Sequence, residues 1–107
     1  MTHIINCTPH DVNIINEAGA VITFPKSGVV PRLKQETQIV GNLNGIPVTE
    51  TVFGETQELP APVEGVFLIV SRLVMSANQN RQDLLVPNDV VRDESGNIIG
   101  CRSFARN

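Results

Sequence analysis

The sequence predicts a mainly β or α+β fold, in which hairpins and one short helix form a single, small, partly closed antiparallel sheet or barrel. Three observations lead to this prediction. Short apolar segments of strand length recur along the chain, two turns of the same type join such segments, and one segment carries a helix start signal. The 107 residues suffice for one domain, 1–107, and not for two.

Two hairpins are predicted from their turns. The segment Asn16–Gly19 lies between the alternating residues Val12–Ile14 and the apolar run Ala20–Phe24. An Asn or Asp that opens a type I turn, with Gly three positions later, closes a hairpin through a bulge, because glycine accepts the positive φ required there. The same arrangement recurs near the C-terminus, at Asp93–Gly96.

The middle of the chain predicts two more strands, Thr37–Val40 and Ile46–Val52, with a turn at Gly41–Gly45 between them. The next segment, 53–62, contains two prolines and shows no periodicity. Proline cannot donate to a strand ladder, so we expect this segment to be a loop.

The most apolar segment, Gly65–Val70, lacks alternation, which predicts a central strand covered on both faces. Ser71 follows it and can cap a helix over Arg72–Ala77, because its hydroxyl can accept a hydrogen bond from a free backbone N–H. A short strand is expected at Asp83–Pro87. On the helix we expect three core residues: Leu73, Val74 and Ala77.

Composition limits the classes of function. Hydrophobic residues make up 41% of the chain, but it has no Trp or Tyr and only four Phe, so the core must be aliphatic. No apolar run approaches the roughly 20 residues of a membrane helix, and no export signal is apparent, so we expect a cytoplasmic protein. The net charge of −3 disfavours a duplex-DNA binder, which usually presents a basic face.

The sequence disfavours three catalytic or metal-binding arrangements. Cys7 and His10 have a spacing that zinc could use, but the other two candidate ligands, His3 and Cys101, are scattered. A reactive Cys–His pair would need proximity, and both cysteines follow isoleucine-rich segments that favour burial. Four carboxylates cluster in the sequence: Asp83, Asp89, Asp93 and Glu94. The last two belong to the predicted turn Asp93–Gly96, and nothing in the sequence shows that the four converge on a substrate. We therefore expect no catalytic residue, no metal and no cofactor.

Anion binding is the arrangement that the polar residues favour. The last third of the chain carries arginines and no lysine, and arginine binds carboxylates and phosphates through two parallel hydrogen bonds. Arg72 lies at a predicted helix start, where free N–H groups attract anions. The candidate ligand-binding residues are Thr8, His10, Arg72, Arg81, Arg92 and Arg102.

Several segments resemble a family of small proteins found in bacteriophages and bacterial genomes. Members typically begin with an Asn-Leu-Thr-Pro-His-like stretch and end with an Arg-Asp-x-x-Gly-x-Ile-Gly-Cys-like stretch. Cys7 stands where that pattern usually has leucine, which supports a buried, apolar role for this cysteine. The segments that carry the resemblance are Asn6–Val12, Phe53–Glu55, Leu59–Gly65, Ile69–Ser71 and Val91–Arg102.

The resemblance implies stoichiometric binding, because small phage proteins often act in that way. Our leading hypothesis is a homo-oligomeric anti-defence sponge that captures a phosphate-bearing small molecule, of the cyclic nucleotide or ADP-ribose type, without turning it over. The alternative is a protein-interaction module that inhibits a host defence enzyme through an exposed strand edge or an Arg-rich face. The third hypothesis is a small enzyme that uses His10 with Cys101 or an aspartate. Self-pairing of open strand edges would explain the expected oligomer.

Overall fold

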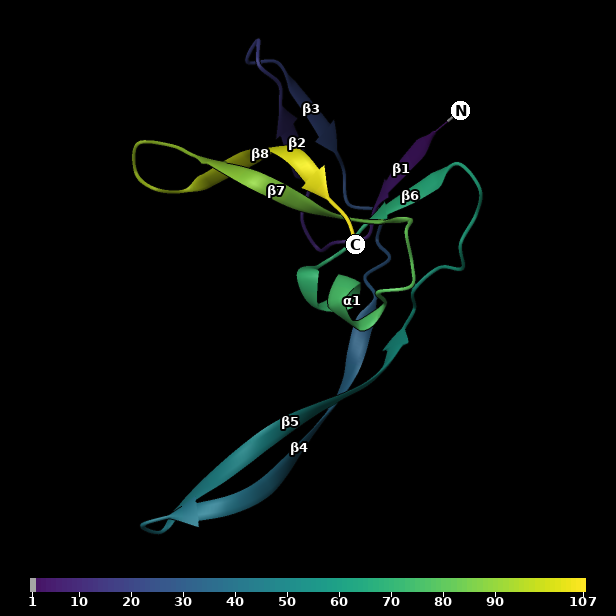
Figure 1. The fold of residues 1–107 in the computed structure, drawn as a ribbon. Helices are drawn as coiled ribbons and strands as arrows, with labels where there is room; N and C mark the ends of the chain where they lie inside the picture. Colours follow the sequence, from purple (N-terminus) through teal and green to yellow (C-terminus); the bar gives the residue numbers. More distant parts are fainter. Residues whose placement is uncertain (1) are drawn as a thin grey trace.

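The computed structural model describes residues 2–107 and is mainly β (Figure 1). One short helix, α1, interrupts eight strands. The elements follow one another in the order β1 (His3–Asn6), β2 (Val12–Ile15), β3 (Val21–Phe24), β4 (Arg32–Leu43), β5 (Ile46–Gln57), β6 (Val66–Ile69), α1 (Arg72–Ala77), β7 (Leu84–Arg92) and β8 (Ile98–Ala105). The predicted fold class is confirmed at this level. Within residues 2–107, no helix has the length and apolarity needed to cross a membrane.

Six strands form one sheet in the order β1-β6-β7-β8-β2-β3, and β4 and β5 pair only with each other. The β2–β3 and β7–β8 pairs are antiparallel hairpins, as predicted. The β2–β8 pair that joins the hairpins is parallel, and so are β1–β6 and β6–β7, so the expectation of a wholly antiparallel sheet was wrong. A single bridge between Asn6 and Lys26 links the two ends of the sheet, which does not close into a barrel.

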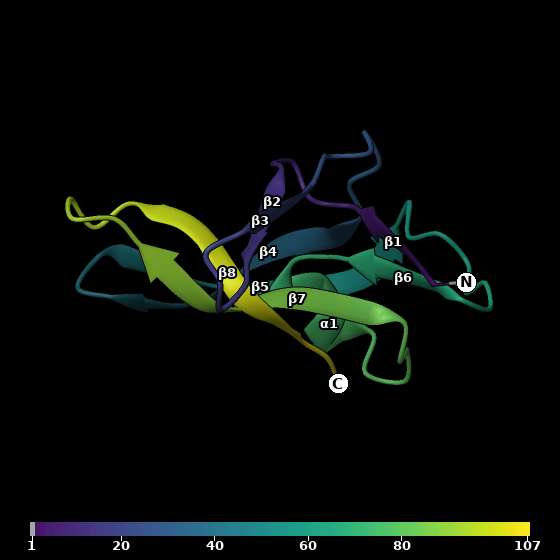
Figure 2. The same cartoon turned by 90° about the horizontal axis from the view of Figure 1, so that it is seen from above.

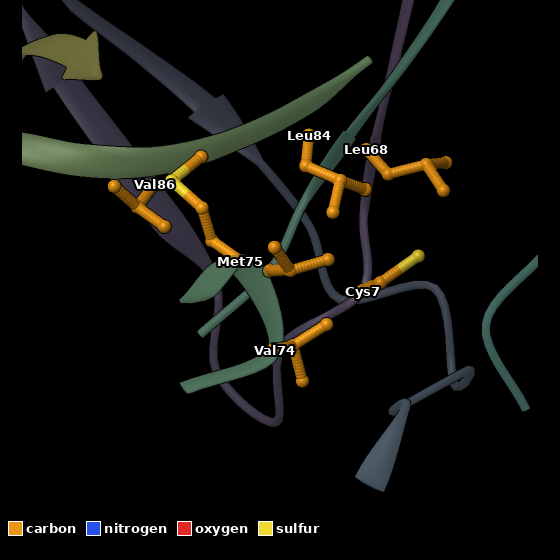
Figure 3. Close-up of a cluster of buried hydrophobic side chains, with 7 residues drawn as sticks. Cys7, Leu68, Val74, Met75, Leu84 and Val86 are labelled. Atoms are coloured by element: carbon orange, nitrogen blue, oxygen red, sulfur yellow. The ribbon is translucent and has the colours of Figure 1, made fainter. Parts of the chain in front are cut away.

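The core lies between α1 and the central strands β6 and β7 (Figure 3). The predicted central strand is confirmed, since Leu68, Ile69 and Val70 are buried. The Ser71 hydroxyl caps α1 by accepting from the Val74 backbone N–H at 3.3 Å. Helix residues Val74 and Met75 face the core, whereas the predicted core residues Leu73 and Ala77 are exposed. The helix is too short to bury a wide stripe, and the sheet covers only one side of it.

Both predicted turns are confirmed in detail. Gly19 and Gly96 adopt φ of +82° and +85°, the region that favours glycine. The side chain of Asn16 accepts hydrogen bonds from the N–H groups of Ala18 and Ala20, and Asp93 accepts from Ser95 and Asn97. The bonds from Asn97 and Ser95 lower the pKa of the Asp93 carboxyl, because they stabilise its charged form.

The hairpin of β4 and β5, which we call the arm, is the largest departure from expectation. Both strands are 12 residues long, and β5 includes Phe53–Gln57, which was predicted to be loop. The register shifts between Leu33 and Gln35, and cross-strand pairs such as Leu33–Thr56 resume beyond the shift, so the ladder reaches the inner end of the arm. The turn is only two residues, Asn44–Gly45. The arm extends away from α1 and the sheet in Figure 1, and in the view from above it passes behind them (Figure 2).

Candidate functional site

The arm exposes almost all of its side chains. In its two strands only Leu33 is buried and Thr56 half-buried. An isolated two-stranded hairpin is marginally stable in water, so the arm depends on its base for support. There Leu33 packs beside Leu73 and Phe53 around a shallow hollow, and Asn78 donates to the Thr56 hydroxyl at 2.8 Å. The body of the protein therefore holds the inner end of the arm and leaves its outer half free.

Seven large apolar side chains of the arm are exposed: Ile39, Val40, Leu43, Ile46, Val48, Val52 and Phe53. Soluble monomers rarely leave such a concentration of apolar groups on one projection, whereas single exposed apolar residues are ordinary. Leu43 and Ile46 are 68% and 67% exposed. The arm is therefore the strongest candidate for a contact surface in residues 2–107.

Register places the apolar groups at the tip on one face. Leu43 pairs with Ile46, and Gly41 pairs with Val48, so these residues point to the same side of the ribbon. We call Leu43, Ile46 and Val48 the tip face. A side chain built on Gly41 would meet no atom within 4 Å, so the glycine leaves an open notch beside Val48. The opposite face of the outer half holds Asn42, Pro47 and Thr49, together with Ile39, which pairs with Thr49.

Charge divides the arm into two halves. The inner half carries Arg32, Lys34, Glu36, Glu50 and Glu55. The outer half, residues 39–49, carries no charged residue. Charged side chains are the usual protection of an exposed hairpin against association, and the outer half lacks them.

The edges of the outer half are nonetheless unsuited to strand addition. Residues that flank a two-residue hairpin turn form a hydrogen-bonded pair, so Pro47, one step further in, presents its nitrogen to the outer edge. Proline has no N–H to donate there. The bulge at Val40, between Ile39 and Gly41, interrupts the edge of β4. The side-chain faces, more than the backbone edges, are therefore suited to contact.

Two of the predicted ligand-binding residues belong to a structural network around Asn6. Asn6 is buried, and its side-chain amide donates to the carbonyl oxygens of His10 and Phe24, both at 2.8 Å. The side-chain oxygen Oδ1 of Asn6 accepts from the N–H of Thr8 at 2.9 Å and from the Thr8 hydroxyl at 2.6 Å. Thr8 thus holds a tight loop, and His10 contributes its backbone while its side chain is exposed.

Two of the predicted arginines are engaged locally. The Arg81 guanidinium donates to both oxygens of Asp83, at 2.8 and 2.7 Å, and to the carbonyl of Pro60 at 2.9 Å. These bonds lower the pKa of the Asp83 carboxyl. Arg92 donates to the Gly96 carbonyl of its own hairpin at 2.8 Å.

The other two arginines are exposed. Arg72 lies 3.4 Å from the Pro87 carbonyl, and Arg102 projects from β8 with no hydrogen bond to the described chain. Contacts within residues 2–107 link none of the four arginines to one another or to Thr8 and His10. The anion-capture hypothesis therefore stays a prediction from sequence, without a cavity that joins its residues.

A separate groove lies on the sheet between β2 and the β7–β8 hairpin. It is lined mainly by apolar side chains, with one acidic residue: Asp11, Val12, Asn13, Pro87, Val90, Ile98, Ile99, Gly100 and Cys101. No arginine lines it. The groove therefore offers no cationic group to a phosphate, and it does not strengthen the capture hypothesis.

Both cysteines are buried, as predicted, at 2% exposure. Burial raises the pKa of the Cys7 thiol, so it stays protonated at neutral pH. The Cys101 thiol lies 3.7 Å from the carbonyl oxygen of Asn13. Among residues 2–107, no three His, Cys, Asp or Glu side chains are grouped closely enough to hold a metal ion.

Comparison with known proteins identifies no relative: no family model, no curated protein and no solved structure matches this chain. The candidate site therefore depends on the geometry alone. The sequence analysis missed the tip face because it treated Gly41–Gly45 as a five-residue turn and ended the first strand at Val40, whereas β4 continues to Leu43. The absence of charge over residues 39–49 was the signal that would have found it.

Proposed function

We propose that the protein acts by stoichiometric protein–protein contact made through the outer half of the arm. The observation that carries this proposal is the exposed, uncharged tip face of Leu43, Ile46 and Val48. Burial of apolar surface is the main favourable term in protein association, at about 25 cal/mol per Å². A partner would remove this surface from water without having to desolvate a charge.

This proposal is the interaction-module hypothesis of the sequence, now assigned to a specific surface. The resemblance to small phage proteins is consistent with it, since stoichiometric binding is the mode of action that it implies. Inhibition of a host enzyme and capture of an anionic ligand remain separate predictions from the sequence.

Site-specific photocrosslinking tests the proposal. Leu43 is replaced by a photoreactive phenylalanine analogue in cells that produce the protein, and Glu17 of the exposed β2–β3 turn is replaced in a matched control. We expect a discrete covalent adduct from position 43 after illumination and none from position 17. An absence of adducts from position 43, or the same adducts from both positions, would contradict the proposal.

A further inference from the structure

We infer that the occupant of the tip face is a second copy of this chain, so that two arms pack face to face in a symmetric dimer. This inference rests on the proposed function, because it names the partner at the same surface. Three properties of the chain support it: the amount of surface it exposes, the charge pattern of the arm and the condition of the arm's edges.

The chain exposes more area than a compact monomer of its mass would. The structure exposes 7552 Å², whereas a compact monomer of its mass exposes about 5,800 Å². The radius of gyration is 17.2 Å, against about 13 Å for a compact chain of this length. The excess of about 1,700 Å² per chain reflects the extended arm, of which the tip face is one side.

A permanent partner must be present whenever the chain is present. A second copy meets this condition, because both subunits come from the same synthesis. The chain exposes this excess area whenever it is unbound, so a permanent partner explains the area better than a transient one does. Homodimers with twofold symmetry are also the commonest oligomers, and they use the same patch on both subunits.

Charge sets the register of the two arms. Residues 39–49 are neutral, and Glu36 and Glu50 mark the start of the charged inner half. When two arms overlap antiparallel over their outer halves alone, neutral apolar surface meets its own equivalent and no glutamate is buried. A longer overlap would bury like charges without partners, which costs several kcal/mol. The arrangement is therefore limited to the outer halves.

The edges decide how the arms meet. Pro47 removes a donor from the outer edge of β5, and the Val40 bulge disrupts the edge of β4. A continuous four-stranded sheet across the dimer is thus disfavoured. The tip face remains, with Leu43, Ile46 and Val48 projecting from it and the Gly41 notch able to receive a side chain of the other copy.

Complementary charges on the tip face test this arrangement in the full chain. Ile46→Glu and Ile46→Lys are purified separately, and mass is measured by light scattering with refractive-index detection, because the chain lacks Trp and Tyr. We expect the wild type at twice 11.6 kDa at micromolar concentration. Each variant alone should raise the dissociation constant at least about a hundredfold, since it buries an unpaired charge. An equimolar mixture should restore part of the dimer, because the interface then holds one negative and one positive charge that attract each other.

Thr49→Glu provides the control, because Thr49 lies on the opposite face of the outer half, three residues from Ile46, where it pairs with Ile39. We expect it to dimerise like the wild type, with far-UV circular dichroism unchanged in all variants. A monomeric wild type, a dimer indifferent to Ile46 variants, a mixture that stays monomeric, or equal damage from Thr49→Glu would each overturn the inference. If the wild type is monomeric but position 43 still crosslinks to a different protein, the proposed function stands and this inference fails.

Discussion

The body and the arm of this protein use apolar residues in opposite ways. In the body, strands β6 and β7 and helix α1 bury Leu68, Val74, Met75, Leu84 and Val86 against one another. In the arm, 24 residues of regular strand bury only Leu33. The two regions have similar backbone hydrogen bonding but different surroundings. The comparison shows that a strand's residue pattern sets its conformation, whereas a second layer of structure decides whether its side chains contribute to stability.

The polar groups differ between the two regions as well. In the body, buried or half-buried polar groups such as Asn6 and Arg81 have hydrogen-bond partners. In the arm, charged groups are confined to the inner half, and the outer half is neutral and exposed. A monomer that had to stay soluble alone would be expected to place its charges where its apolar groups are most exposed.

Truncation of one leucine in each region gives the largest contrast. Leu84→Ala empties a site that is 0% exposed, and we expect it to lower the free energy of unfolding by about 3 kcal/mol. Leu43→Ala changes a side chain that is 68% exposed, and at dilution it should change that free energy by less than about 0.5 kcal/mol. Urea unfolding followed by circular dichroism measures both. Similar losses in the two variants would show that the arm tip is already packed within the monomer.

The Asn6 network gives the next effect in size. Asn6→Leu removes both bonds to the carbonyls of His10 and Phe24 and the acceptor for Thr8, so half-buried polar groups of this loop lose partners. We expect a loss of about 2 kcal/mol and a melting temperature lower by about 10 °C. Thr23→Val, on exposed strand β3, is the control and should change much less. An unchanged melting temperature in Asn6→Leu would mean that the network does not organise the loop.

The smallest effect concerns the pH dependence of the body. Because Arg81 lowers the pKa of Asp83 in the folded state, the pair stabilises the fold fully above the ordinary carboxyl pKa of 3.8. That contribution, about 1 kcal/mol, is lost as pH falls through the lower folded-state pKa. In Asp83→Asn, the free energy of unfolding should therefore decrease less steeply below about pH 4 than in the wild type. In the variant, Asp93, whose pKa is also lowered, supplies the remaining pH dependence of stability. Parallel pH profiles for the wild type and the variant would contradict this account.

Local signals in the sequence predicted the local structure well. Gly19 and Gly96 carry the positive φ that their turns require, and Ser71 caps the helix that was placed after it. The apolar run before Ser71 is the central strand. Each of these features depends on residues within a few positions of one another, so a single sequence contains enough information to identify them.

The candidate site was harder to predict, because it consists of side chains that no other part of the chain covers. The arginines lie far apart in the sequence, and only the fold shows that Arg81 pairs with Asp83 and Arg92 with its own turn. The strands of the arm were predicted in part, at Thr37–Val40 and Ile46–Val52. Their full length depends on cross-strand pairing that continues past two bulges, which a pattern along one chain does not reveal.

By itself, the sequence determined the β-rich class, the two tight turns, the capped helix and the burial of both cysteines, because conformational preference and apolar content act over short distances. The tertiary structure alone decided the parallel pairings, the solitary position of the arm and the exposure of its tip. Those features depend on which layers meet across long separations in the chain, and no local preference of a residue specifies that.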